Sequence, residues 1–225
     1  MTDRLHNWGR LALWALPVYG ALLAVSTITQ QPDYQTDFPA YARYVTTPQF
    51  LLSHLVASIG GAGFGLVGAA GLFILADQVA SRLARWGFVL WSFAQVGLVS
   101  VFGVAAFFQP AIGRAFLDGG GDIAVAINED VYGGPVLVMV GVSLVLFIAG
   151  GILLGVAASR KQMLPRWAGF TFAASVTLFV VGFFLFDVAQ PVAGLGIALA
   201  GVGFAVGARR SAAAGVDLQS TQGRS

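Results

Sequence analysis

Long apolar runs that are almost free of charged residues constrain this chain more than any other feature of its sequence. Crossing about 30 Å of hydrocarbon takes roughly 20 residues of helix, and six stretches reach that length. A spanning backbone must satisfy its own hydrogen bonds, and the ten-residue alternation of a membrane barrel is absent. We therefore predict an all-α, multi-pass membrane protein whose six transmembrane helices cover about 9–30, 50–76, 86–108, 133–157, 167–189 and 191–208.

The composition agrees with a lipid-facing surface. Charged residues make up 10% of the 225 positions and hydrophobic residues 57%, whereas soluble domains have roughly 25% charged residues. The chain has no Cys, which excludes disulfides, thiolate catalysis and Cys-ligated metals. The first apolar run lacks a small-x-small cleavage pattern, so we read it as a retained span.

The basic residues divide unevenly between the two ends of these spans. Lys and Arg gather on the cytoplasmic side of membrane proteins. We predict a cell-membrane protein with both termini in the cytoplasm, outer loops at 31–49 and 109–132, one domain over 1–208 and a disordered cytoplasmic tail over 209–225. The predicted inner side has Arg4, Arg10, Arg82, Arg85, Arg160, Lys161, Arg166, Arg209, Arg210 and Arg224, and the outer side has Arg43 and Arg114.

A spacing pattern suggests three helical hairpins related by an internal repeat. Each Gln-Pro dipeptide follows a Trp by 23 residues, a helical rise of about 34 Å. We interpret the Trp as the inner end of an outgoing span and Gln-Pro as its outer end. The alternative is that Trp favours interfaces and Pro often ends helices without any repeat. The three pairs are Trp8 with Gln31-Pro32, Trp86 with Gln109-Pro110, and Trp167 with Gln190-Pro191.

Glycine pairs mark the returning spans, while the outgoing spans carry most of the Phe. Small residues let helix backbones approach closely in lipid. We therefore predict that the second, fourth and sixth helices form the packed centre and that the others face lipid. Gln95, on the third span, is the best candidate for a buried polar contact. The predicted packing positions are Gly61, Gly65, Gly151, Gly155, Gly203 and Gly207.

Candidate chemistry lies at the predicted outer rim. No ionisable residue falls at the bilayer midplane, which argues against a proton- or sodium-coupled transporter. His54, Glu129, Asp130 and Asp187 all lie near the outer ends of spans. If these side chains converge, they form a candidate catalytic group for acid–base work or a metal site, although no motif fixes the geometry.

Each of these residues also has a purely structural explanation. Glu129 and Asp130 precede the fourth predicted helix, where acids complement the helix dipole. Asp187 reaches the headgroups or pairs with an outer Arg, and His54 bonds to a loop carbonyl. These alternatives stay open at the level of sequence.

Three functions remain compatible with the sequence. The first is a structural or accessory membrane subunit. Its partners are the lipid bilayer and either further copies of itself, in a homo-oligomer, or another membrane subunit. The second is an outer-rim membrane enzyme or lipid-binding protein acting on an apolar substrate. The third is a transporter or channel for a small neutral solute, with a cavity near Gln95. We expect no nucleic-acid partner, and the sequence indicates no particular cofactor.

Overall fold

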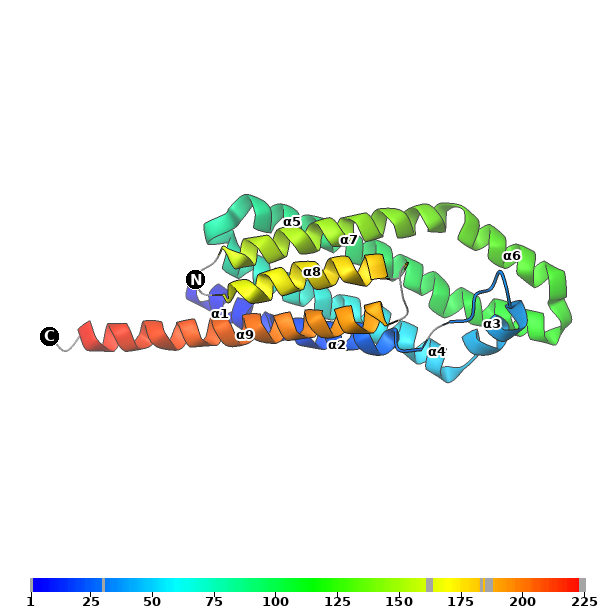
Figure 1. The fold of residues 1–225 in the computed structure, drawn as a ribbon, viewed down its shortest axis with the longest axis horizontal. Helices are drawn as coiled ribbons and strands as arrows, with labels where there is room; N and C mark the ends of the chain where they lie inside the picture. The colour runs from blue at the N-terminus through cyan, green and yellow to red at the C-terminus, as the bar shows by residue number, and fades with distance from the viewer. Residues whose placement is uncertain (1, 30, 161–163, 183, 185–187, 223–225) are drawn as a thin grey trace.

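The computed structural model describes residues 2–29, 31–160, 164–182, 184 and 188–222, and within them it is helical with no strand, as predicted (Figure 1). The elements in chain order are α1 (Thr2–Ala12), α2 (Ala15–Ser26), α3 (Phe38–Val45), α4 (Pro48–Leu52), the π-helix η1 (Ser53–Gly60), α5 (Gly61–Ala115), the π-helix η2 (Phe116–Gly120), α6 (Gly121–Gly133), α7 (Pro135–Ser159), α8 (Arg166–Gly182) and α9 (Ala189–Gln222).

Among the described residues, five helical segments are long and apolar enough to cross a membrane. The prediction of several membrane-spanning helices is confirmed at that level. α8 is apolar but has 17 residues, less than one full crossing, and the residues that follow it lie partly outside the described ranges. A sixth span therefore stays a prediction. The five segments are Arg4–Ser26, Pro48–Asp77, Ala80–Gly133, Pro135–Ser159 and Ala189–Ala212.

Two local breaks shape the bundle. Pro17 has no N–H to give to the carbonyl of Leu13, and the chain tightens there, with Leu16 N donating to Leu13 O at 3.1 Å. This break separates α1 from α2. The second break lies inside α5, where Ala80 leaves the helical region (φ −132°, ψ 47°) and the chain turns back on itself. The rings of Phe73 and Phe88 stack across that turn, 5.3 Å apart.

The bundle core draws on every one of its long helices. α9 packs between α2 and α8, and α7 packs between α8 and the second half of α5. Trp91 and Phe172 are fully buried, although they belong to the third and fifth predicted spans. The prediction that the outgoing spans face lipid is therefore wrong. Each long helix packs between two others, so one face of each is buried, whether the helix is an outgoing or a returning span.

Glycines permit the closest crossings of this bundle. A Cβ on Gly155 would lie 2.5 Å from the carbonyl oxygen of Gly169, where α7 meets α8. The crossing of α2 and α9 depends on Gly20 and Gly194, which the sequence reading did not select. A Cβ on Gly194 would lie 2.6 Å from the backbone nitrogen of Ala24. These four positions hold two pairs of neighbouring helices, α7 with α8 and α2 with α9, at backbone contact.

The other predicted packing glycines differ in how tightly they are enclosed. Gly151 lies against Val176, and Gly203 lies against Trp167; an added Cβ would come within 2.6 Å of either neighbour. Gly65 lies beside Tyr19 and Gln95. Gly61 has only ordinary contacts, the nearest at 3.7 Å from Leu22, and Gly207 is half-buried.

The prediction of a loop over 109–132 is wrong, because that segment is helical on both sides of a turn, where Gly119 (φ 100°) and Gly121 (φ 38°) leave the helical region. α5 runs through Pro110 to Ala115, and η2 and α6 lead on to α7. Pro110 removes one backbone hydrogen bond without ending the helix. Pro191 lies near the start of α9 and does not close α8. Gln-Pro therefore does not mark a common helix end, and the internal repeat stays a prediction.

A second, smaller group of helices lies at one end of the bundle. We call it the cap, and it consists of α3, α4 and residues 105–133. It occupies the right-hand end in Figure 1, opposite both termini. Asp37 caps α3 by accepting a hydrogen bond of 2.9 Å from Ala40 N. The cap has its own apolar core, formed by Phe38, Tyr41, Ala42, Val45, Phe50, Ala105, Ile112 and Ala124.

α9 continues past the predicted end of the sixth span. Its helix extends to Gln222 and projects beyond the bundle at the end where the N-terminus lies (Figure 1). The structure therefore gives no support to the disorder predicted for 209–225, which stays a prediction.

Candidate functional site

A cavity of about 560 Å³ opens where the bundle meets the cap. Its walls come from the end of α2, the segment that follows α2, α3, η1, the second half of α5, α8 and α9. Apolar and hydrogen-bonding side chains share the lining. The lining residues are Leu23, Ser26, Thr27, Thr29, Gln31, Pro32, Asp33, Tyr34, Tyr44, Ser53, His54, Ser58, Phe102, Phe179 and Gln190.

His54 is the one predicted site residue that the structure places in this cavity. Its Nδ1 lies 3.0 Å from the carbonyl oxygen of Phe50. A carbonyl can only accept, so this contact assigns the proton of the neutral ring to Nδ1 and leaves a lone pair on Nε2. The ring is held between aromatic neighbours, with centroids 4.1 Å from Phe50 and 6.3 Å from Phe102. His54 therefore offers an oriented hydrogen-bond acceptor.

A π-helical segment carries this histidine. α4 begins at Pro48 after an N-cap at Thr47, whose hydroxyl accepts from Phe50 N at 3.2 Å. The helix then widens over Ser53–Gly60. Ser58 Oγ donates to the carbonyl of Ser53, five residues earlier, at 3.4 Å. Widened turns of this kind occur frequently at functional sites.

Amide and hydroxyl groups complete the polar part of the wall. Gln190 Nε2 donates to the carbonyl of Phe179 at 3.4 Å, which ties the start of α9 to α8. The hydroxyls of Thr29 and Tyr44 lie 3.2 Å apart. Asp33 contributes the only carboxylate among the lining residues, and its Oδ1 accepts from Gln35 N at 3.0 Å.

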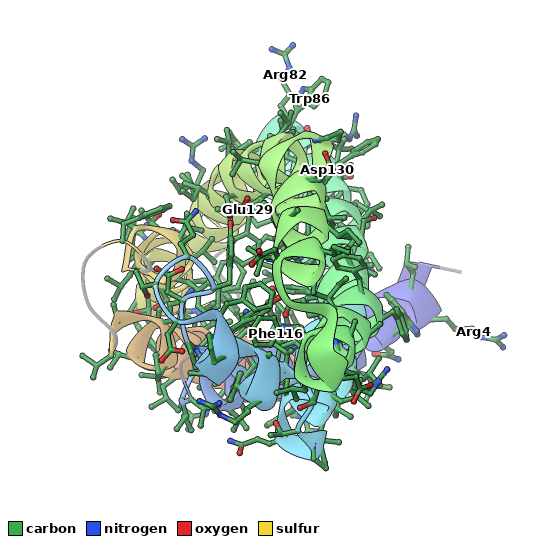
Figure 2. All side chains as sticks on the ribbon, turned by 90° about the vertical axis from the view of Figure 1, so that its right-hand side faces the viewer. Arg4, Arg82, Trp86, Phe116, Glu129 and Asp130 are labelled. Carbon is green, nitrogen blue, oxygen red and sulfur yellow. The ribbon has the colours of Figure 1, made fainter. Side chains whose placement is uncertain are left out.

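The other predicted site residues do not join His54. Glu129 and Asp130 project from α6 and are exposed, and neither lines the cavity (Figure 2). Both lie in the last turns of α6, and α7 begins only at Pro135, so neither is a first-turn acid as the structural alternative proposed. Asp187 lies outside the described residues. Across the described ranges, no group of three or more His, Cys, Asp or Glu side chains is placed to hold a metal ion.

Gln95 makes a buried polar contact at the centre of the bundle. It is 1% exposed, and its Nε2 donates to the hydroxyl of Tyr19 at 2.9 Å. Trp91 Nε1 nearby donates to the carbonyl of Gly65 at 3.2 Å. These groups satisfy one another within the packed core.

A second buried polar cluster lies in the cap, and the sequence reading missed it. Tyr41 donates to Asn128 Oδ1 at 3.0 Å, and Gln109 Nε2 donates to the hydroxyl of Tyr132 at 2.6 Å. Burial raises the pKa of Tyr41, and Tyr132 and Tyr34 nearby raise it further. The sequence does hold one indication of this cluster. Asn128 and Tyr132 are four residues apart, so they share one face of α6.

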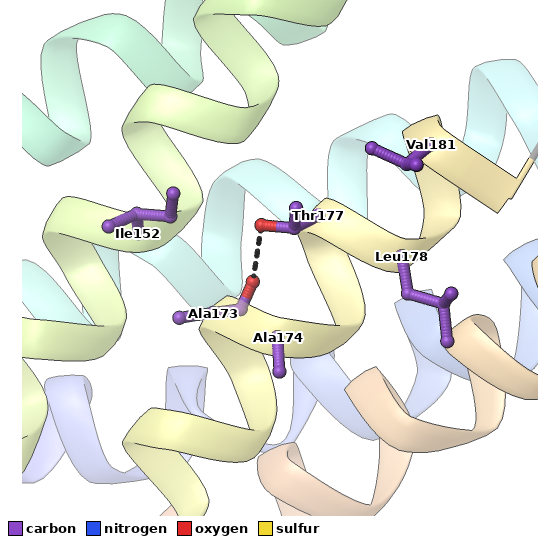
Figure 3. A pocket seen from close by; sticks show the side chains of 6 residues that line it. All are labelled: Ile152, Ala173, Ala174, Thr177, Leu178 and Val181. Atoms are coloured by element: carbon purple, nitrogen blue, oxygen red, sulfur yellow. Dashed lines mark hydrogen bonds between the residues drawn. The ribbon is translucent and has the colours of Figure 1, made fainter.

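A shallow apolar groove runs along the outside of the bundle between α7 and α8 (Figure 3). Its volume is about 480 Å³, and its residues are Ile152, Ala173, Ala174, Thr177, Leu178 and Val181. Thr177 uses its hydroxyl within its own helix, donating to the carbonyl of Ala173 at 2.9 Å. The groove thus offers a bound molecule apolar contact and little else.

Comparison with protein-family models, with curated proteins and with solved structures finds no match for this chain. Functional inference therefore depends on the geometry of the cavity around His54.

Proposed function

We propose that this chain is a multi-pass protein of the cell membrane, with both termini in the cytoplasm, that binds an amphipathic, bilayer-soluble molecule in the cavity at its extracytoplasmic end. The observation that carries the proposal is the cavity itself, in which His54 presents an oriented acceptor beside an apolar wall.

The distribution of charge supports this orientation. Both termini lie at one end of the bundle, and the cap lies at the other (Figure 1). The turn near Ala80 is followed by Arg82 and Arg85, which belong to the arginine-rich side of the chain. Since the cytoplasmic side collects Lys and Arg, the cap and the cavity beneath it belong outside.

α8 serves as the fifth crossing in this proposal. It begins at Arg166, on the arginine-rich side, and packs between α7 and α9. The chain must return to the outer side before α9 begins at Ala189. The three predicted hairpins then become consecutive pairs of crossings, the last pair being α8 and α9.

The lining indicates the chemistry of the ligand. Leu23, Phe102 and Phe179 offer apolar contact to a chain or ring. His54 Nε2 accepts a hydrogen bond, and no partner of this atom lies among the described residues. A molecule with an apolar body and a hydroxyl or amine head meets both requirements. The described acids give His54 no carboxylate partner, so we propose binding and no reaction.

The two competing functions receive less support. An accessory subunit that associates through its glycine faces needs those faces unoccupied, yet Gly155 and Gly203 are in contact with neighbouring helices of the same chain. A solute pathway past Gln95 needs space at a point where that side chain is buried and bonded to Tyr19. An oligomer or a partner subunit remains compatible with the proposed binding role.

Photochemical cross-linking tests the proposal. The protein in lipid nanodiscs is labelled with a photoactivatable monoacylglycerol, and the labelled peptides are mapped by mass spectrometry. His54→Phe keeps an aromatic ring but removes the acceptor, and we expect labelling around η1 to fall by about tenfold. Thr177→Val, in the groove of Figure 3, is the matched control and should not change that labelling. Equal labelling in both variants would contradict the proposal.

A further inference from the structure

A pair of buried hydrogen-bond donors at the cytoplasmic end of the bundle lacks acceptors. Nε of Arg10 and Nε1 of Trp14 are both inaccessible to solvent, and neither has a partner among the residues whose side chains are described. Each of these nitrogens can only donate. Buried donors are nearly always paired in folded proteins, so two at one place indicate a missing acceptor.

The two donors lie on one turn of the N-terminal segment. Arg10 and Trp14 are four residues apart, and in this tightened turn Leu13 N donates to Gly9 O at 3.2 Å and Trp14 N donates to Leu11 O at 3.1 Å. Gly9 faces Ile74 and Leu75 of α5. Arg10 directly follows Gly9, so its side chain points away from this α5 contact.

α9 supplies a second positive charge on that side. The guanidinium carbon of Arg209 lies 4.9 Å from the centroid of the Trp14 ring, a cation–π contact. Arg10 uses Nη1 to donate to Asn7 Oδ1 at 3.0 Å, which leaves its Nε unpaired. Arg209 therefore places a guanidinium group beside Trp14, whose own indole N–H is unpaired, one turn from the unpaired Nε of Arg10.

The acids described at this end do not neutralise the region. Asp77 lies before the α5 turn and pairs with Arg85, which follows that turn, through a contact of 3.0 Å. Arg10 lies six residues inside the candidate span that begins at Arg4, and Arg209 lies three residues before the end of the candidate span that closes at Ala212. Six residues of helix are about 9 Å, a depth close to that of lipid headgroups.

We propose that Arg10, Trp14 and Arg209 bind a phosphate oxyanion, supplied by the headgroup of an anionic phospholipid in the cytoplasmic leaflet. An oxyanion accepts from both unpaired N–H groups and balances the two guanidinium charges. Basic sites between helices on the cytoplasmic side hold such headgroups in other membrane proteins. The position of the three residues inside candidate spans favours the lipid over a soluble phosphate.

Binding measurements on the full chain separate these sources. In one arm, nanodiscs of phosphatidylcholine with increasing phosphatidylglycerol are used, and bound anionic lipid is counted by native mass spectrometry. In the other, inorganic phosphate is added to the protein in detergent and the shift in Tm is recorded. Retention of phosphatidylglycerol supports the proposal as stated. A Tm shift with phosphate and no lipid retention overturns the lipid assignment.

Three variants and one control decide whether these residues are responsible. Arg10→Gln and Arg209→Gln remove one charge each, and Trp14→Phe removes the indole N–H together with one of the two rings; each should weaken lipid retention by about threefold to tenfold. Arg82→Gln removes the charge of an exposed side chain that projects from the bundle just after the α5 turn (Figure 2). This variant should leave retention within about twofold. If Arg82→Gln weakens retention as much as the other variants do, or if Trp14→Phe has no effect, the site is wrong. Trp14→Phe keeps an aromatic ring beside Arg209 and every charge of the bundle, and its Tm in detergent shows separately whether the variant is folded.

Discussion

The hydroxyl of Tyr41 on α3 donates a hydrogen bond of 3.0 Å to Oδ1 of Asn128 on α6, and both side chains are completely buried. This contact joins two segments that are 87 residues apart in the chain. The bond lies in the apolar core of the cap, so it fixes the position of α3 against α6. Tyr44 on α3 and Tyr34 in the segment before α3 line the cavity where it meets the cap.

Removing the Tyr41 hydroxyl should loosen the cap. In Tyr41→Phe the amide oxygen of Asn128 is left buried without a donor, at a cost of about 1–3 kcal/mol in the free energy of unfolding. The cap should then be cleaved faster by a protease added from outside, with a lower Tm. Tyr44→Phe, whose hydroxyl bonds at an exposed position, is the control and should have little effect. A Tm unchanged in Tyr41→Phe would show that the bond contributes nothing.

Alkaline pH should destabilise the same contact. Burial raises the pKa of Tyr41 in the folded protein above its ordinary value of about 10. A raised pKa means that the neutral hydroxyl stabilises the fold fully below pH 10, and that this contribution is lost as the pH rises above about 10 toward the folded pKa. Protease sensitivity of the cap should therefore rise in that range. Tyr41→Phe should flatten this part of the profile, and an unchanged profile would assign the effect to other groups.

The α2–α9 crossing should not tolerate a side chain at Gly194. In Gly194→Ala the new Cβ would meet the backbone of Ala24 at 2.6 Å, so the helices must separate, at about 1–3 kcal/mol. Thermal unfolding in detergent measures the loss. Gly141→Ala is the matched control, since no atom lies within 4 Å of its Cβ position. Equal Tm values for the two variants would mean that the crossing is looser than described.

Single-cysteine labelling should place the segment that leads into α3 of the cap outside and the α7–α8 connection inside. The chain has no Cys, so each introduced thiol is the only one. Thr36→Cys should react with a membrane-impermeant maleimide in intact cells, and Arg160→Cys only after the membrane is opened, because Arg160 belongs to the arginine-rich side. Both positions are exposed in the structure. Labelling of Arg160→Cys in intact cells would reverse the proposed orientation and move the cavity to the cytoplasmic side.

Much of the candidate site lay beyond sequence reasoning. His54 is predicted as a site residue because it lies near the outer end of a span, and it lines the cavity. Glu129 and Asp130 were grouped with it because the segment before them was read as a loop. The segment instead continues the helices, which carries these acids out into the cap and away from the cavity. The apolar spacing of Phe108, Ile112 and Phe116 indicated this helix, but Pro110 obscured it.

The sequence by itself determined the helical class and the apolar segments, because the need to bury every backbone hydrogen bond in lipid is a local requirement that each run of residues meets or fails alone. Only the tertiary structure decided which faces turn inward, that Gly20 meets Gly194, and that Tyr41 bonds to Asn128. These are contacts between segments distant in the chain, and they depend on how each helix is rotated and offset against its neighbours. Composition and spacing along a single helix carry no record of that geometry.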